Sequence, residues 1–210
     1  MADHGAKVWI SFLIWAMDKI FKIKHQFKGI ENLPKNEGFI VACKHQSMWE
    51  TMVMHIVFNR PVYAYKKELL KVPFYGWFLR KMSGITIDRT GGTKALKSLL
   101  TQSKKYLDNK QAIIIFPQGT RTPIGSTVQE YPYQAGITAL YSKLNVKIVP
   151  AALNSGLYWS KKGFTGKKGT ITLKFLPAIE PGLDKKEFLS RLQNSIESNS
   201  EKLAKTTTNN

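Results

Sequence analysis

The feature that most restricts the fold is a set of short, wholly apolar segments separated by stretches with helical periodicity. Residues 112–116 are apolar without interruption, as is typical of a strand buried on both faces. Residues 39–43 form a comparable run, and 146–153 is also strand-like, with Lys147 as its one charged residue. Strands that alternate with helices predict an α/β fold, here one twisted, mostly parallel or mixed sheet of about seven strands flanked by helices.

The remaining elements follow from periodicity and turn residues. Residues 21–27 alternate apolar and polar side chains, which predicts a half-exposed edge strand. Further strands are expected at 61–65, 85–87 and 171–176, and helices at 47–58, 68–83, 95–107 and 134–143. An Asp184-x-x-Glu187 pattern predicts the start of a C-terminal helix, and 163–169 is expected to be a Lys/Gly-rich loop.

Length and composition indicate one globular domain. The chain has 210 residues, of which 43% are hydrophobic and 22% charged, unlike a disordered protein. The predicted division is an N-terminal membrane-interface helix at 1–19, an α/β domain at 20–205 and a tail at 206–210. The single cysteine, Cys43, excludes an internal disulfide, and no cluster has metal-ligand spacing. Cys43 also lies two residues before a histidine, but a lone cysteine in an apolar strand usually serves packing.

The charge is strongly basic. The sequence has 32 Lys and Arg against 14 Asp and Glu, a formal net charge of +18. Such an excess favours polyanionic partners: nucleic acid, an anionic membrane surface, or acidic carriers and nucleotide-bearing substrates.

The N-terminal segment has an unusual aromatic content. Residues 8–17 are apolar except for Ser11, roughly half of the ~20 residues that a spanning helix needs. Three rings lie in this stretch, at Trp9, Phe12 and Trp15, and lysines follow it. This mix predicts a helix at a membrane interface with its basic end toward lipid head groups. The alternative is an amphipathic helix that packs on the core.

A turn between a strand and a helix holds the first candidate for chemistry. His45 follows the apolar run 39–43, and Ser47 begins a Ser-x-x-Glu pattern that ends at Glu50. With His45 outside the helix and Glu50 in its first turn, the chain can fold back and pair them, which leaves one imidazole nitrogen free to accept a proton. Alternatively, Glu50 only completes a capping box with Ser47.

Two arginines follow other predicted strands. Arg89 follows the strand at 85–87, and Arg121 lies in the turn after 112–116. Because the ends of parallel strands share an edge of the sheet, these residues and His45 could converge there. Arginines near free backbone N–H groups such as those of Gly119 and Thr120 would make a phosphate site. The alternative is that each arginine is a surface ion-pair partner.

Four segments, in this order, carry a resemblance to a known family. They are Lys-His-Gln-Ser-Met-Trp-Glu at 44–50, Gly-Ile-Thr-Ile-Asp-Arg at 84–89, Phe-Pro-Gln-Gly-Thr-Arg-Thr at 116–122 and Ile-Val-Pro-Ala-Ala-Leu at 148–153. Together they resemble the motifs of the bacterial 1-acyl-sn-glycerol-3-phosphate (lysophosphatidate) acyltransferases. Four ordered motifs are far more specific than any one of them.

The resemblance implies a membrane-associated enzyme that moves a fatty acyl group from acyl-CoA or acyl carrier protein to the 2-hydroxyl of lysophosphatidate, giving phosphatidate. By matching position, His45 is the base and Glu50 its orienting carboxylate, while Arg89, Gly119, Thr120 and Arg121 bind the phosphate. No metal, other cofactor or nucleic acid is implied. The expected location is the cytoplasmic face of the membrane, with peripheral or shallow attachment.

Two positions depart from the family pattern. The usual aspartate of the first motif is Glu50 here, one methylene longer, and the usual glutamate of the third motif is Gln118. Two other functions also fit the sequence: acyl transfer to another lysolipid, such as one lacking phosphate, and non-catalytic binding of anionic membranes or nucleic acid by a basic protein.

Overall fold

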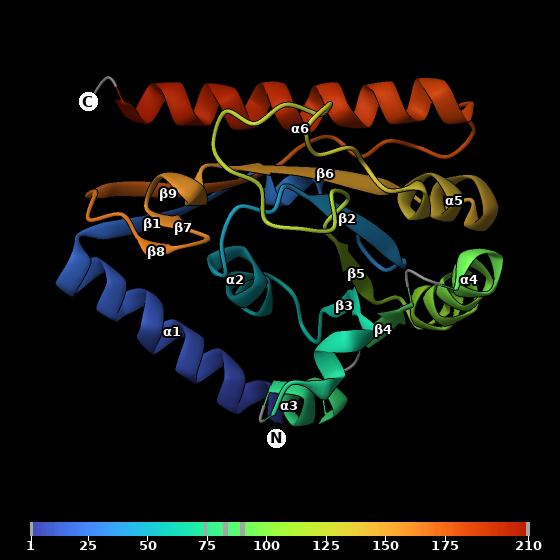
Figure 1. The fold of residues 1–210 in the computed structure, drawn as a ribbon, viewed down its shortest axis with the longest axis horizontal. Coiled ribbons are helices and arrows are strands. Elements are labelled where there is room, and N and C mark those ends of the chain that lie inside the picture. Colours follow the sequence, from blue (N-terminus) through green and yellow to red (C-terminus); the bar gives the residue numbers. More distant parts are fainter. Residues whose placement is uncertain (1, 74, 82–83, 89–90, 209–210) are drawn as a thin grey trace.

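A seven-stranded sheet forms the centre of the molecule (Figure 1). The structure is a computed structural model that describes residues 2–73, 75–81, 84–88 and 91–208. From one edge to the other, the strands are β1 (Ile23–Lys28), β9 (Gly169–Phe175), β6 (Ile148–Leu153), β2 (Phe39–Cys43), β5 (Ala112–Ile115), β3 (Val62–Lys66) and β4 (Gly84–Ile87).

Five of these strands are parallel to one another. β6, β2, β5, β3 and β4 run in one direction, and β9 and β1 run in the other. The predicted α/β class and the mostly parallel or mixed seven-stranded sheet are therefore confirmed. The carboxyl ends of five strands share one edge of the sheet, where ligand sites of α/β proteins commonly lie.

Helices cover both faces of the sheet. One hydrophobic cluster joins the sheet to α1 (Ala2–Phe21) and α2 (Trp49–Val57), and a second joins it to α4 (Gly92–Asp108), α5 (Ala135–Leu144) and α6 (Lys185–Thr208). The shorter elements are α3 (Tyr75–Lys81), the 3-10 turns η1 (Ile30–Asn32), η2 (Lys67–Lys71) and η3 (Ser155–Leu157), and a small hairpin of β7 (Trp159–Ser160) and β8 (Gly163–Phe164).

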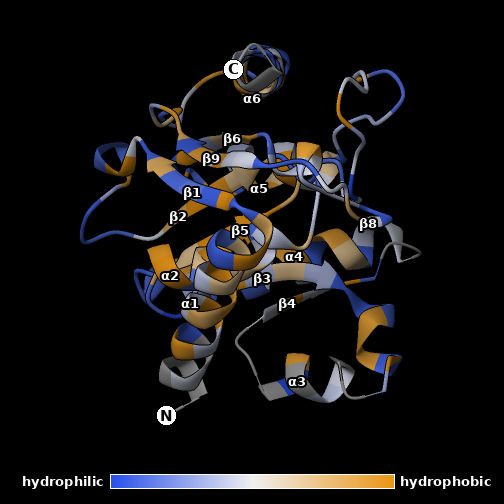
Figure 2. Cartoon of the chain, turned by 90° about the vertical axis from the view of Figure 1, so that its left-hand side faces the viewer, coloured by the Kyte–Doolittle hydropathy of each residue, from blue (hydrophilic) through white to orange (hydrophobic). Residues whose placement is uncertain are grey.

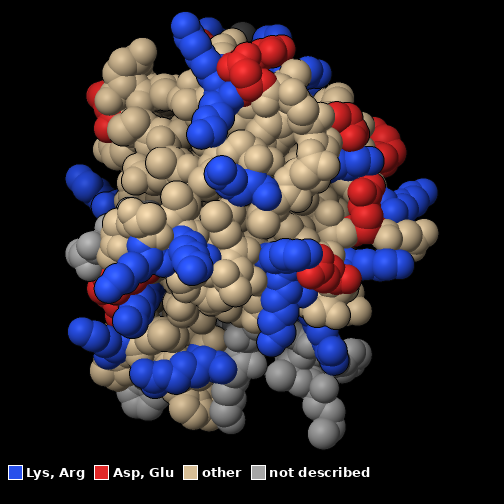
Figure 3. Space-filling view, turned by 90° about the vertical axis from the view of Figure 1, so that its right-hand side faces the viewer, with Lys and Arg blue, Asp and Glu red and all other residues tan. Residues whose placement is uncertain are grey.

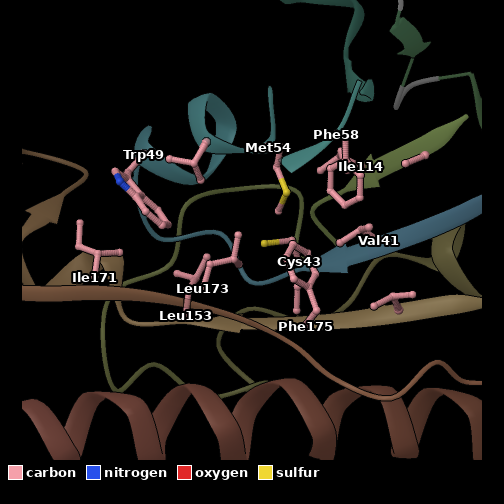
Figure 4. Packing of buried hydrophobic residues seen from close by; sticks show 14 of the residues in the cluster. Val41, Cys43, Trp49, Met54, Phe58, Ile114, Leu153, Ile171, Leu173 and Phe175 are labelled. Atoms are coloured by element: carbon pink, nitrogen blue, oxygen red, sulfur yellow. The ribbon is translucent and has the colours of Figure 1, made fainter. Parts of the chain in front are cut away.

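Strand β2 shows why the central strands are apolar throughout. Val41 and Cys43 point toward α2, where they pack near Met54 (Figure 4), whereas Ile40 and Ala42 belong to the cluster on the opposite face. All five residues of β2 are buried. A strand between two helical layers needs apolar side chains at successive positions, so the alternation of a half-exposed strand disappears.

Several predicted boundaries change. Phe21 belongs to α1, so the edge strand begins at Ile23, and α1 extends two residues beyond the predicted 1–19 segment. Residues 163 and 164 form β8, so the stretch predicted as a loop contains half of a hairpin. Helix α6 continues to Thr208, and residues 206–208 are helical rather than tail. The Asp184 cap is confirmed, since its Oδ1 accepts hydrogen bonds from the backbone N–H groups of Lys186 and Glu187.

Helix α1 divides its apolar residues between two environments. Ile10 and Met17 are buried, whereas Trp9, Phe12 and Trp15 are 59%, 53% and 55% exposed. Figure 2 shows hydrophobic residues, in orange, along this helix. The core-packing alternative therefore holds for one side of α1, and the membrane interface remains a prediction for the other. Among the described residues, no helix combines the length and apolar character needed to cross a bilayer.

The basic residues lie at the surface. Figure 3 shows Lys and Arg spread over the side of the molecule where α4 and α5 lie. Helix α4 exposes Lys94, Lys97, Lys104 and Lys105, and Lys104 pairs with Asp108 at 2.9 Å. Leu96, Leu99 and Leu100 of this helix pack in the second cluster, so α4 has an apolar face and a lysine face.

Phe188 provides a test of how α6 is held to the rest of the fold, here to α5. Its ring is fully buried and stacks on Tyr141 with centroids 3.8 Å apart. We expect Phe188→Ala to lower the free energy of unfolding by about 3–5 kcal/mol, because the substitution removes buried apolar area and leaves a cavity. Urea denaturation measures this loss. Ile30→Ala, at a 49% exposed side chain, is the control and should change stability by less than about 1 kcal/mol. Equal effects at both positions would contradict the packing described here.

Candidate active site

His45 and Glu50 meet where the chain leaves β2. His45 Nδ1 lies 2.9 Å from Glu50 Oε1. His45 is in the turn and Glu50 is the second residue of α2, so the chain folds back on itself as the spacing predicts. The sequence-based pairing of these two side chains is confirmed as geometry.

The Glu50 carboxylate is fully buried and accepts five hydrogen bonds from the described residues. Its Oε1 accepts from His45 and from the backbone N–H groups of Gln46 and Ser47. Its Oε2 accepts from the hydroxyls of Ser47 and Ser155, at 2.7 and 2.8 Å. Burial raises the pKa of Glu50, but the hydrogen bonds from His45 and Ser47 and the charge interaction with His45 outweigh burial and hold this pKa below its ordinary value. Glu50 is therefore a carboxylate at neutral pH.

The two interpretations of Glu50 turn out to be compatible. Ser47 N–H donates to Glu50 Oε1 at 2.7 Å, which is the backbone half of a capping box. In the other half of a capping box, the Ser47 hydroxyl would accept from the Glu50 N–H. Here Ser47 Oγ accepts from the Trp49 N–H at 3.0 Å, one residue earlier. The N-cap is Met48 rather than the predicted Ser47. The same carboxylate both orders the start of α2 and binds the imidazole.

The imidazole plane is fixed by an aromatic neighbour. The ring of His45 stacks on Phe116, with centroids 4.0 Å apart and an interplanar angle of 18°. Its side chain is 16% exposed. With Nδ1–H donating to Glu50, the Nε2 lone pair is the proton-accepting group. The arrangement holds the imidazole in one orientation at the sheet edge, with Nε2 not hydrogen-bonded within the described residues.

The turn after β5 lies against His45. Thr122 N–H and Oγ1–H donate to the His45 carbonyl oxygen at 2.8 and 3.2 Å. Gly119 has a φ of +67°, a left-handed conformation that glycine adopts at little cost. Thr120 and Arg121 are half-buried between these two residues. The structure thus brings His45 together with the predicted phosphate-binding turn of Gly119, Thr120 and Arg121.

The third predicted loop lies farther along the edge. Strand β3 separates β4 from β5, so the exit of β4 is three strands from β2. Asp88, at this exit, pairs with Lys67 at 3.7 Å. Arg89 lies outside the described residues, and its predicted place in the phosphate site stays a prediction.

Gln118 helps to close the loop that follows β5. Its side chain is buried, and its Nε2 donates to the carbonyl oxygen of Tyr131 at 3.2 Å. Gln134 N–H donates to the Pro117 carbonyl oxygen at 2.8 Å. These two bonds close the base of the 118–133 loop. An amide can donate to a carbonyl in this place, whereas a carboxylate cannot, which gives the departure from the family pattern a physical reason.

Several groups that hold the site in place were missed by sequence reasoning. Lys44 is 3% exposed and pairs with Glu197 of α6 at 2.6 Å, and Tyr133 donates to the other oxygen of Glu197 at 2.9 Å. Burial and the Glu197 charge raise the pKa of Tyr133 well above its ordinary value. Ser155 is another missed residue. The Lys44–Glu197 and Glu50–Ser155 contacts join positions more than 100 apart, and Tyr133 and Glu197 are 64 apart. No spacing signal links such distant positions, so only the fold could reveal these contacts.

Two other kinds of chemistry find little support in the site. Burial, together with the charge of Glu50, raises the pKa of the Cys43 thiol well above its ordinary value, and a neutral buried thiol is a poor nucleophile. Within the described ranges, no three His, Cys, Asp or Glu side chains gather into a group that could hold a metal ion.

Comparisons with known proteins agree with this geometry. A family model described as Acyltransferase matches residues 24–154. A 1-acyl-sn-glycerol-3-phosphate acyltransferase from Pseudomonas aeruginosa is 37% identical over 171 residues, which are 81% of this chain and 65% of that protein. The corresponding protein from Bacillus subtilis is 32% identical over 139 residues, 63% of this chain and 65% of its own. The chain therefore spans just under two thirds of the length of these relatives.

A solved structure shares the fold. The crystal structure of the 1-acyl-sn-glycerophosphate (LPA) acyltransferase PlsC from Thermotoga maritima aligns with a TM-score of 0.70 at 22% identity, over 97% of this chain and 83% of that one. The family model covers more than half of the chain and includes His45, Glu50 and the turn after β5. The resemblance noted in the four motifs is confirmed at the level of the family, and the chain belongs to the acyltransferase family.

Proposed function

We propose that this protein moves a fatty acyl group from a thioester donor, acyl-CoA or acyl carrier protein, to the 2-hydroxyl of 1-acyl-glycerol-3-phosphate, giving phosphatidate. The observation that carries the proposal is the His45–Glu50 pair, in which a buried carboxylate holds Nδ1 and no described residue hydrogen-bonds to Nε2. The curated relatives named above are 1-acyl-sn-glycerol-3-phosphate acyltransferases, which supports the choice of acceptor.

The reaction needs one proton to be moved twice. His45 Nε2 accepts the proton of the acceptor hydroxyl while the oxygen forms a bond to the thioester carbonyl carbon. The C–S bond then breaks, and the thiolate leaves with the proton from His45. Glu50 stabilises the imidazolium between these steps and keeps the ring in one tautomer. The thioester is already activated, so the proposal includes no metal and no cofactor beyond the acyl donor.

The phosphate of the acceptor would bind beside the base. Arg121, with the backbone N–H groups of Gly119 and Thr120, lies in the turn that Thr122 connects to His45. A guanidinium is well suited to a phosphate. The Gly119 N–H, predicted to be free, donates to the Phe116 carbonyl oxygen at 2.8 Å, so the proposed site depends mainly on Arg121. Arg89 is included in this proposal on the strength of the motif alone. Activity on a phosphate-free lysolipid, with none on lysophosphatidate, would favour the alternative acceptor class.

The proposed location is the cytoplasmic face of a membrane. Helix α1 carries exposed aromatic side chains, and its last residue, Phe21, stacks on Phe164 of β8 with ring centroids 4.8 Å apart. Phe164 is itself 44% exposed, and Lys161 and Lys162 occupy the hairpin turn beside it. Aromatic rings next to lysines suit the boundary between acyl chains and anionic head groups.

Loss of the carboxylate charge tests the pair. We expect Glu50→Gln to lower kcat by about 10²- to 10⁴-fold, the size of a general-base contribution. The fold should survive, because the amide N–H₂ can donate to the hydroxyls of Ser47 and Ser155, which also accept hydrogen bonds. Release of free CoA from acyl-CoA in the presence of lysophosphatidate measures turnover. His45→Ala sets the lower limit, and the double variant should be no slower, since the two residues act as a unit. Normal turnover in Glu50→Gln would leave Glu50 as a cap only.

The phosphate site is tested at Arg121. Arg121→Ala should lower kcat/KM for lysophosphatidate by about 10-fold or more, because a charge-assisted hydrogen bond contributes about 1.5–3 kcal/mol. Arg121→Lys should recover only part of this loss, since it lacks the bidentate fork. Arg191→Ala, at an exposed position on α6, is the matched control. If both alanine variants have the same kinetics as the natural protein, Arg121 does not contact the phosphate.

Membrane attachment is tested by substitution rather than deletion, because Ile10 and Met17 of α1 are buried. The combined variant Trp9→Ala, Phe12→Ala, Trp15→Ala should bind anionic vesicles at least about 10-fold more weakly, since each ring would otherwise insert apolar area. Its melting temperature should change little. Added salt should weaken binding of the unaltered protein. Unchanged vesicle sedimentation in the triple variant would rule out α1 as the attachment site, and Ile30→Ala is the control for loss of an exposed apolar side chain.

A further inference from the structure

Ser155 is the one described side chain outside the 45–50 segment that hydrogen-bonds to Glu50. Its Oγ–H donates to Glu50 Oε2 at 2.8 Å, and the residue is fully buried. Ser155 begins η3, directly after β6, and β6 pairs with β2 in the sheet. The Ser155 hydroxyl therefore reaches Glu50 from the end of the neighbouring strand, β6, and not from the turn that precedes α2.

The other donors to Glu50 belong to its own turn, which other segments bind through His45 and Gln46 rather than through the carboxylate. Those on His45, Gln46 and Ser47 all belong to the turn that precedes α2, so they would move with Glu50 if the turn shifted. Among the described residues, Ser155 is the one that bonds the carboxylate itself to a second segment, and its Oγ also lies 3.0 Å from Ser47 Oγ. The bond from Ser155 also completes the coordination of Oε2, which would otherwise accept only from Ser47.

Ser155 is itself held firmly. Asn154, just before it, accepts from Thr172 N–H at 2.8 Å with its side-chain oxygen. Gly156, just after it, donates its N–H to the Gln46 side-chain oxygen at 3.0 Å. Tyr158 N–H donates to the Ser155 carbonyl oxygen at 3.1 Å. These bonds join η3 to β9 on one side and to the His45 turn on the other, so the hydroxyl position is set by the sheet.

We propose that Ser155 is a positioning residue, which holds the Glu50 carboxylate in the orientation that aligns His45 for proton transfer. The proposal rests on the proposed role of His45 and Glu50. Ser155 is fully buried behind Glu50 and does not touch the substrate. Its removal acts on the chemical step and leaves acceptor binding unchanged.

The experiment compares Ser155→Ala with a matched serine. Ser155→Ala lowers kcat roughly 10- to 100-fold, the effect of one hydrogen bond to a charged group, and leaves the KM for lysophosphatidate within about 2-fold. Ser155→Thr, which retains the hydroxyl, recovers most of kcat. Ser200→Ala is the control. Ser200 is 5% exposed, and its Oγ accepts from the N–H of Leu153, the last residue of β6, at 3.4 Å. No hydrogen bond joins Ser200 to Glu50 among the described residues. Ser200→Ala should lower the free energy of unfolding without changing the kcat of the folded enzyme.

A double-variant cycle separates positioning from simple packing. In the Glu50→Gln background, Ser155→Ala should lower kcat by less than about 2-fold, because residues that act through one another are not additive. If Ser155 only fills space, its effect would be the same in both backgrounds and would follow the melting temperature.

The outcomes also distinguish this proposal from the proposed function. If His45→Ala is fully active, the role of the pair is wrong. If His45→Ala is inactive while Ser155→Ala has a normal kcat, or if its effect is fully additive with Glu50→Gln, the positioning role alone is overturned.

Discussion

Burying a carboxylate charge is strongly unfavourable unless hydrogen-bond donors surround it. The site is organised around that requirement at Glu50. Its five hydrogen bonds come from the turn after β2 and from the start of η3. Both segments must therefore be in place before the charge can be buried. The same set of bonds orients the imidazole of His45, so stability and the proposed chemistry depend on one group.

The central position of β2 explains why the site forms there. β2 lies between β6 and β5, and all three are parallel. Their carboxyl ends bring three segments to one place: η3 with Ser155, the turn with His45, and the 117–122 turn. The β5 side supplies Phe116 against the ring and Thr122 against the backbone. An edge strand would have a neighbour on one side only.

The two helical layers have different roles. On one face, α1 is anchored through Ile10 and Met17 and leaves its aromatic rings exposed, which suits a protein whose proposed acceptor resides in a membrane. On the other face, α6 reaches Lys44 through the Glu197 pair. A buried ion pair contributes less to stability than its short distance suggests, because both charges lose their hydration. Its geometric effect is to hold α6 beside the turn that contains His45.

Local pattern was sufficient for the strands of the main sheet, for the long helices and for the His45–Glu50 pair, but it missed the β7–β8 hairpin. Apolar periodicity and turn residues are properties of neighbouring positions, and five residues of separation allow a turn to close on itself. The ordered motifs likewise pointed to the family. Boundaries moved by a few residues where packing extended a helix, as at Phe21 and Thr208. The order of the strands, the distance of β4 from the site, and the contacts of Ser155, Glu197 and Tyr133 came from the fold. These depend on which distant segments share a sheet edge or a helix face, and no local rule relates residues that meet only through the sheet.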